Sequence, residues 1–246
     1  IHPLIMEIKA LLGTAIITIG FLGVGTAAEH RWNQTNLGPT FGASLKPSGK
    51  GVKWEHTAKV IAVRVGSSGN AGIGFDTDML RVVAGWTDGF IRVNPGRNAL
   101  LDHHSARGIA QFSTRRNTGW TDAGEWKDFP KNQGPIPREH GRYEGLYMHG
   151  DRVIFSYTIG KGAVLESPWL IEEGDFRVFT RTFEVDNSLV GEQIYIADGQ
   201  SGVPTLQEVS SISLLTRDAG DGQILVVAVK GHASANLVTG NGQCSR

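Results

Sequence analysis

The sequence has a single cysteine among its 246 residues, so it contains neither a disulfide framework nor a four-cysteine zinc site. Its 24 basic side chains equal its 24 acidic ones, which argues against a strongly basic nucleic-acid-binding protein and against an acidic tail. No segment after residue 28 shows the period of about 3.6 residues that marks an amphipathic helix. The P-loop, the dinucleotide fingerprint and the Gly-x-Ser-x-Gly nucleophile elbow are also absent. These absences leave a neutral globular chain in which we expect no metal site and no cofactor.

Residues 1–28 read as a few upstream residues followed by a signal peptide that starts at Met6. Residues 10–24 are an apolar run of 15 residues, shorter than the roughly 20 residues that cross a bilayer. The segment ends in Thr-Ala-Ala, which resembles a signal-peptidase site, so we expect cleavage after Ala28. Residues 29–246 would then work in the periplasm or outside the cell, with no membrane span.

The rest of the chain alternates with period two, the pattern of β-strands. The clearest examples are 57–65, 152–159 and 176–185, and turn residues separate about ten such runs. The 33 glycines fit a chain with many tight turns, because glycine adopts a positive φ without a steric penalty. The sequence therefore predicts an all-β fold, a single antiparallel β-sandwich domain over 29–246.

Residues 142–148 and 152–159 flank a His-Gly-Asp turn and predict an antiparallel hairpin in the middle of the sheet. In that hairpin, Phe155 and Tyr157 should be buried and Arg152 mostly exposed.

Residues 94–141 interrupt the strand pattern. They show no clear strand, yet they contain Trp120 and Trp126. A loop of this length is usually functional or disordered, and large aromatic side chains argue against disorder. We expect the segment to pack across one face of the sandwich and to form one wall of its largest pocket.

Two blocks of the sequence resemble a known bacterial family, domain-of-unknown-function family 6797. The first is GFDTDMLRVVAGWTDGFI at 74–91; the second is GRYEGLYMHGDRVIFSYTIGKGAVLESPW at 141–169, continued by FTRTFEV at 179–185. The resemblance implies a secreted protein of the planctomycete and verrucomicrobial kind, in which this domain often precedes c-type haem modules and dehydrogenase-like propellers. It supplies no established activity and no catalytic residues.

The same resemblance implies a c-type haem or dehydrogenase domain as a partner. The chain has no Cys-x-x-Cys-His, so any haem c would belong to a further domain downstream. We expect this chain to be the N-terminal part of a longer protein, since Cys244 is followed by only two residues and no closing element.

The polar pair Asp76 and Asp78 is the most specific candidate for a ligand site, because both carboxylates would point to one side of an extended segment. The alternative is structural: Asp76 would be the more buried, held by backbone N–H groups or by Arg81, and Asp78 would lie nearer solvent.

The segment 94–141 supplies the other candidates. The rings of Trp120 and Trp126 suit stacking on a sugar, and Arg115 and Arg116 suit a carboxylate or sulfate on a substrate. His103 and His104 complete the set of candidate ligand-binding residues, although adjacent side chains of an extended chain point in opposite directions. The alternatives are packing for the tryptophans and a solvated surface for the charged groups.

Three functions remain open on these residues. The first is a noncatalytic binding or docking module for a glycan, or for a fused c-type haem or dehydrogenase domain. The second is a carbohydrate-active enzyme, a lyase or hydrolase, that uses Asp76, Asp78, Glu144 or a loop histidine as acid and base. The third is a purely structural domain. A cleft between Trp120, Trp126 and the FDTD segment would favour the first two.

Overall fold

The computed structural model describes residues 35–95, 102–122, 134–174, 176–189, 192–198, 205–207, 212–218, 223–229 and 233–239. Its elements are, in chain order, β1 (Thr40–Lys46), β2 (Thr57–Val65), β3 (Ala71–Asp76), β4 (Arg81–Thr87), β5 (Ile91–Arg92), β6 (His104–Ala106), β7 (Ile109–Ser113), β8 (Trp120–Asp122), β9 (Gly141–His149), β10 (Arg152–Ile159), β11 (Gly162–Glu173), β12 (Phe176–Val185), the 3₁₀ turn η3 (Asn187–Leu189), β13 (Glu192–Asp198), β14 (Thr205–Gln207), β15 (Ile212–Asp218), β16 (Gln223–Val229) and β17 (Ala233–Thr239).

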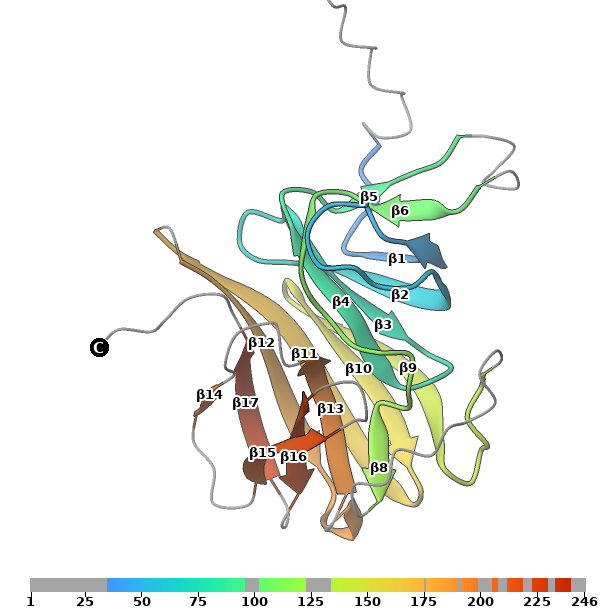
Figure 1. Cartoon of the computed structure of the whole chain (residues 1–246), viewed down its shortest axis with the longest axis vertical. Coiled ribbons are helices and arrows are strands. Elements are labelled where there is room, and N and C mark those ends of the chain that lie inside the picture. The colour runs from blue at the N-terminus through green and yellow to red at the C-terminus, as the bar shows by residue number, and fades with distance from the viewer. Residues whose placement is uncertain are drawn as a thin grey trace, which may run out of the picture.

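The strands form three sheets (Figure 1). One has seven strands in the order β5-β6-β1-β2-β3-β4-β7, one has six in the order β14-β17-β12-β11-β10-β9, and one has four in the order β15-β16-β13-β8. Neighbouring strands are antiparallel except β1 and β6, which run parallel. In Figure 1 the seven-stranded sheet occupies the upper part of the view, and most of the other two sheets lies below it.

The main core lies between these sheets. Phe75 of β3 stacks on Phe155 of β10 with ring centroids 4.3 Å apart, and Phe179 of β12 packs edge-on against Phe112 of β7. These buried rings replace water with apolar contacts from several strands at once, which is the dominant favourable contribution to folding.

A second core covers the opposite face of the seven-stranded sheet. Trp86 of β4 stacks on Trp54 at 6.4 Å and donates its indole N–H to the carbonyl of Phe90. Strands β3 and β4 are consequently buried on both faces along their whole length. Burial on both sides explains why 82–86, Val-Val-Ala-Gly-Trp, is apolar throughout rather than alternating.

The prediction of an all-β, mainly antiparallel fold is confirmed. The described strands number seventeen rather than about ten and form three sheets, so the two-layer sandwich stays an expectation. The hairpin of β9 and β10 is confirmed, with Phe155 and Tyr157 buried. Its placement in the middle of a sheet is wrong, because β9 is an edge strand. Arg152 is partly buried rather than mostly exposed, since its guanidinium lies 4.0 Å from the ring centre of Trp169.

The segment 94–141 also differs from the prediction. It contributes β6, β7 and β8 to two different sheets, so the expectation of no strand is wrong there. These strands have three to five residues, too few to show a period of two in the sequence.

The predicted signal peptide and Cys244 lie outside the described residues. Within the described ranges, no helix is long and apolar enough to cross a membrane.

Candidate functional site

The site begins at a tight turn between β3 and β4, residues 76–80. Asp76 ends β3, and the residue is only 3% exposed. Its Oδ1 accepts the backbone N–H of Asp78 at 3.0 Å and of Met79 at 3.1 Å. A carboxylate that accepts two N–H groups two and three residues ahead fixes the path of the turn. The prediction that Asp76 is buried and held by backbone N–H groups is therefore confirmed.

Arg81 connects this turn to a distant part of the chain. Its Nε lies 3.4 Å from Oδ2 of Asp76, and only 2% of the arginine is exposed. Its Nη1 donates to the carbonyl and hydroxyl of Thr114 and to the carbonyl of Arg115, at 2.8–3.2 Å. Burial raises the pKa of Asp76, and Arg81 with the two N–H groups opposes that shift. Burial lowers the pKa of Arg81, and Asp76 opposes it.

Two backbone bonds bring further segments to the same turn. The carbonyl of Met79 accepts the N–H of Gly119 at 2.8 Å, and the carbonyl of Asp78 accepts the N–H of Ile136 at 2.9 Å. With Arg81, these bonds hold 114–119 and 134–136 against one five-residue turn.

Leu80 is strained at the centre of this arrangement. It is buried, and its φ of 49° lies in the left-handed region, which bulky residues rarely adopt. Gly119 lies so close that a Cβ there would meet the Leu80 carbonyl oxygen at 1.8 Å. Such strain costs on the order of 1–3 kcal/mol and persists only where the surroundings enforce it, which often occurs at functional sites.

A pocket opens beside the turn, with a cavity volume of about 200 Å³. We call it the Trp120 pocket. Its walls combine apolar side chains, an indole, two threonines, two glutamates and an imidazole: Met79, Leu80, Thr118, Trp120, Thr121, Ile136, Glu139, His140, Ile159, Gly160 and Glu192. Six of these eleven residues come from 118–140, so the segment 94–141 supplies much of the wall of this cavity, although the cavity is smaller than the one beside His104.

A buried polar network holds Trp120 in place. Its Nε1 donates to the hydroxyl of Tyr157 at 3.2 Å, and that hydroxyl donates to Oε2 of Glu166 at 2.8 Å. Arg181 completes the network through its Nε, 2.6 Å from Oε1 of Glu166. Tyr157, Glu166 and Arg181 are each at most 1% exposed. Burial, and then the Glu166 carboxylate, raise the pKa of Tyr157 well above its ordinary value, so the phenol stays a donor.

Sequence reasoning missed this network, although one signal was present. Arg181 shares a face of β12 with Phe179 and Phe183, and a charged residue on an apolar face requires a buried partner. Which residue would supply the partner depends on the pairing of β12 with β11, which places Arg181 beside Pro168, two residues from Glu166.

The predicted site residues do not gather in one place. Trp120 lines the pocket but is only 6% exposed, and Asp78 pairs with Lys59 at 3.1 Å with its side chain 20% exposed. The prediction that Asp78 lies nearer solvent than Asp76 is confirmed. Arg115 offers its carbonyl to Arg81, and Arg116 is exposed on the same loop. Trp126 lies outside the described residues.

The two histidines lie apart from the Trp120 pocket. His103 stacks on His56 with ring centroids 4.0 Å apart. His104 accepts the N–H of Asn94 on Nδ1 and lines a separate, mainly apolar pocket of about 350 Å³ with Phe41. Among the residues that the structure describes, no group of three His, Cys, Asp or Glu side chains could hold a metal ion.

Residues 73–166 match the model of a family described as a domain of unknown function (DUF6797). The match confirms the family that the sequence blocks indicated, over less than half of the chain. It covers the turn 76–80, Trp120 and Glu166. Neither a curated protein nor a solved structure matches the chain.

Proposed function

We propose that this domain is a noncatalytic binding module of the periplasm or cell exterior, and that it holds one sugar unit of a glycan in the Trp120 pocket. The observation that supports the proposal is that this pocket lies beside the strained turn held by Arg81 and is lined by Trp120, which a buried polar network fixes in place. Pockets with a few fixed polar groups on an apolar wall are the usual form of small-ligand sites.

The lining supplies what recognition of a sugar requires. Trp120 offers part of an indole, and Thr118 and Thr121 with Glu139 and Glu192 supply oxygen atoms that can bond sugar hydroxyls. The cavity of about 200 Å³ is smaller than the roughly 300–1,000 Å³ of sites for drug-sized ligands, which favours a single sugar unit over a long segment.

A hydrolase is the second candidate, because two carboxylates line the same cavity and glycoside hydrolysis uses such a pair. That pair would be Glu139 and Glu192. Asp76 and Asp78, the pair considered from the sequence, are not the hydrolase pair that we propose, since Asp76 holds the turn and Asp78 pairs with Lys59. Glu144, also considered from sequence, pairs with Arg142 on β9. Docking to a c-type haem or dehydrogenase domain remains a proposal that rests on the family resemblance.

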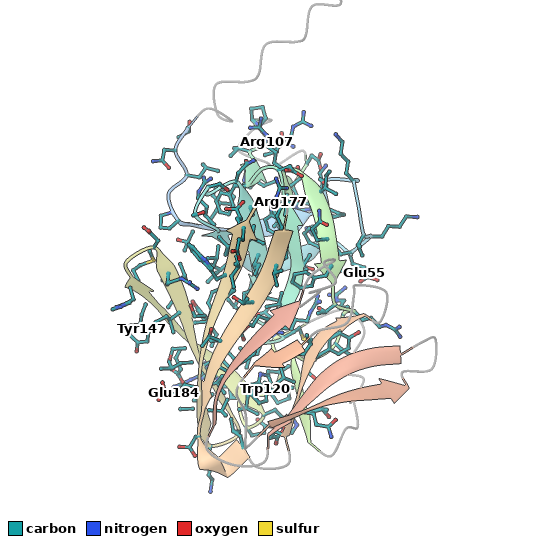
Figure 2. All side chains as sticks on the ribbon, turned by 90° about the vertical axis from the view of Figure 1, so that its left-hand side faces the viewer. Glu55, Arg107, Trp120, Tyr147, Arg177 and Glu184 are labelled. Atoms are coloured by element: carbon teal, nitrogen blue, oxygen red, sulfur yellow. The ribbon has the colours of Figure 1, made fainter. Side chains whose placement is uncertain are left out.

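The binding proposal is tested on an oligosaccharide array with neutral, acidic and amino-containing chains. The full chain should bind a subset of them, and Glu139→Gln should weaken that binding about tenfold or more, the range for a lost bond to a charged group. Glu184→Gln is the matched control, because Glu184 is exposed on β12 and does not line the pocket (Figure 2 labels Glu184 and Trp120). Absence of binding to every chain on the array would refute the proposal, and cleavage of a bound chain would replace it by the hydrolase.

A further inference from the structure

A second cavity lies at the edge of the seven-stranded sheet, where β1, β5 and β6 meet (Figure 1). We call it the His104 pocket. Its volume of about 350 Å³ falls in the range of roughly 300–1,000 Å³ that small-ligand sites occupy. Leu37, Phe41, Val93 and Pro95 give it a mainly apolar wall, and none of the described residues that line it is Lys, Arg, Asp or Glu. A ligand of this pocket would therefore be largely apolar and would meet no charged side chain in the wall.

The imidazole of His104 is a polar group of this wall with a fixed orientation. Its Nδ1 accepts the backbone N–H of Asn94 at 3.0 Å, and its ring packs edge-on against Phe41 with ring centroids 5.2 Å apart. Because a backbone N–H can only donate, Nδ1 carries no proton, and the proton of the neutral imidazole is on Nε2. Burial, and then the neighbouring imidazole of His103, lower the pKa of His104, so the ring is neutral at pH 7 and above.

The Nε2–H group of His104 has no acceptor among the residues that the structure describes, since the bond from Asn94 is the imidazole's hydrogen bond there. We propose that the His104 pocket binds an uncharged, largely apolar molecule of one or two rings that presents one hydrogen-bond acceptor, such as an aromatic ketone. The ligand's oxygen would accept the Nε2–H, and its rings would pack on the apolar wall. The rings of Phe41 and His104 favour an aromatic ligand, because aromatic pairs attract beyond the area that they bury.

The same observations disfavour three other classes of ligand. A metal ion would need the lone pair of Nε2, which the proton occupies as long as Nδ1 accepts from Asn94. An anion would leave water without gaining a counter-charge, since the described lining contains no Lys or Arg. A sugar would bring several hydroxyl groups to a mainly apolar wall. The inference is independent of the proposed sugar site, because no residue lines both pockets.

The test is a ligand-observed NMR titration of the full chain at pH 7.5 with three probes that share a two-ring body. These are 2-acetonaphthone, which has one neutral acceptor, 2-ethylnaphthalene, which has none, and 2-naphthoate, whose acceptor is charged. The ketone should bind about fivefold or more tightly than the hydrocarbon, the effect of one hydrogen bond, and more tightly than the carboxylate. Equal binding of ketone and hydrocarbon, tighter binding of the carboxylate, or no binding of any probe would each overturn the inference.

Variants show whether the probes occupy this cavity. Leu37→Trp fills it and should abolish binding of the ketone and the hydrocarbon. His104→Phe keeps a ring and removes the donor, so it should bind the two probes equally. His149→Phe is the matched control and should keep the preference for the ketone, because His149 is exposed on β9 and lines neither pocket.

Thermal melts establish that each variant is folded. Binding that survives Leu37→Trp, or a preference for the ketone that survives His104→Phe, would place the probes elsewhere and overturn the inference. If His104→Phe does not fold because the Asn94 N–H loses its acceptor, the three probes with the unaltered chain and with Leu37→Trp decide the question.

Discussion

Replacement of Asp76 by alanine should be among the most damaging single changes outside the apolar core. The carboxylate accepts the N–H groups of Asp78 and Met79 and lies 3.4 Å from a guanidinium nitrogen of Arg81. Alanine would leave both donors without an acceptor and Arg81 buried without its counter-charge. The same turn positions the walls of the Trp120 pocket, so the change should also weaken ligand binding.

The magnitude follows from the two kinds of contact. A hydrogen bond to a charged group contributes about 1.5–3 kcal/mol, and breaking a buried ion pair costs about 3–5 kcal/mol. The two estimates overlap, because one carboxylate makes both kinds of contact, and Arg81 keeps its bonds to Thr114 and to the Arg115 carbonyl. We expect Asp76→Ala to lower the free energy of unfolding by about 3–5 kcal/mol.

Two further variants show how much of this loss of stability comes from the charge of Asp76 and how much is specific to that position. Asp76→Asn keeps an oxygen for the N–H groups and removes only the charge, so it should lose about half as much. Asp78→Ala is the control: its partner Lys59 is 62% exposed, and an exposed ion pair contributes about 0–1 kcal/mol. Urea unfolding at pH 7 measures all three, provided that the denaturant dependence stays constant. If Asp78→Ala proves as destabilising as Asp76→Ala, the turn does not depend on Asp76 and the reasoning is refuted.

Two other predictions concern the surroundings of the site, and a third concerns the stacked pair of His56 and His103 away from it. Gly119→Ala should destabilise the fold by about 1–3 kcal/mol or more, because its Cβ would meet a backbone carbonyl, whereas Gly42→Ala has open space and should be close to neutral in the same thermal melts. Glu166→Gln should cost about 3–5 kcal/mol in urea unfolding, because Arg181 would stay buried without a counter-charge, and a loss below about 1 kcal/mol would contradict the network. Burial and the stacked imidazole of His103 lower the pKa of His56. The contribution of neutral His56 to folding stability should therefore be fully present above pH 6.5, and it should be lost as the pH falls from 6.5 through the lowered pKa of His56. His56→Gln should therefore reduce the fall in melting temperature between about pH 7.5 and pH 5, and an unchanged fall would rule out this group.

The sequence predicted those parts of the fold that local pattern controls. Strands β2, β10 and β12 alternate clearly, and the structure places them at the expected bounds. The short strands β6–β8 escaped prediction because their stability comes from pairing with distant segments rather than from their own pattern. The edge position of β9 also depends on which strands pair, which alternation does not reveal.

The site was only partly accessible from sequence, for the same reason. Asp76 was identified with its partner Arg81, since the two lie at either end of one short turn and an unpaired buried carboxylate always costs free energy. Glu139 and Glu192 were not identified, because they lie 53 positions apart in the numbering. They line one pocket only because Ile136 bonds to the turn at Asp78 and β8 pairs with β13. Trp120 was assigned to a loop, whereas it begins β8 and packs into the core.

The contacts also predict how much of the chain the fold requires. The family match ends at residue 166, yet Glu166 needs Arg181, β8 needs β13, and β3 needs β2, which precedes the match. A fragment of residues 73–166 would leave a buried carboxylate without its partner and the edges of β3 and β11 unpaired. We expect this fragment to show no cooperative thermal transition and a poorly dispersed NMR spectrum, whereas residues 35–246 should show both a transition and dispersion. A fragment that melts cooperatively would mean that the matched region folds as an independent unit, and that the Trp120 pocket, which includes Glu192, is an addition to it.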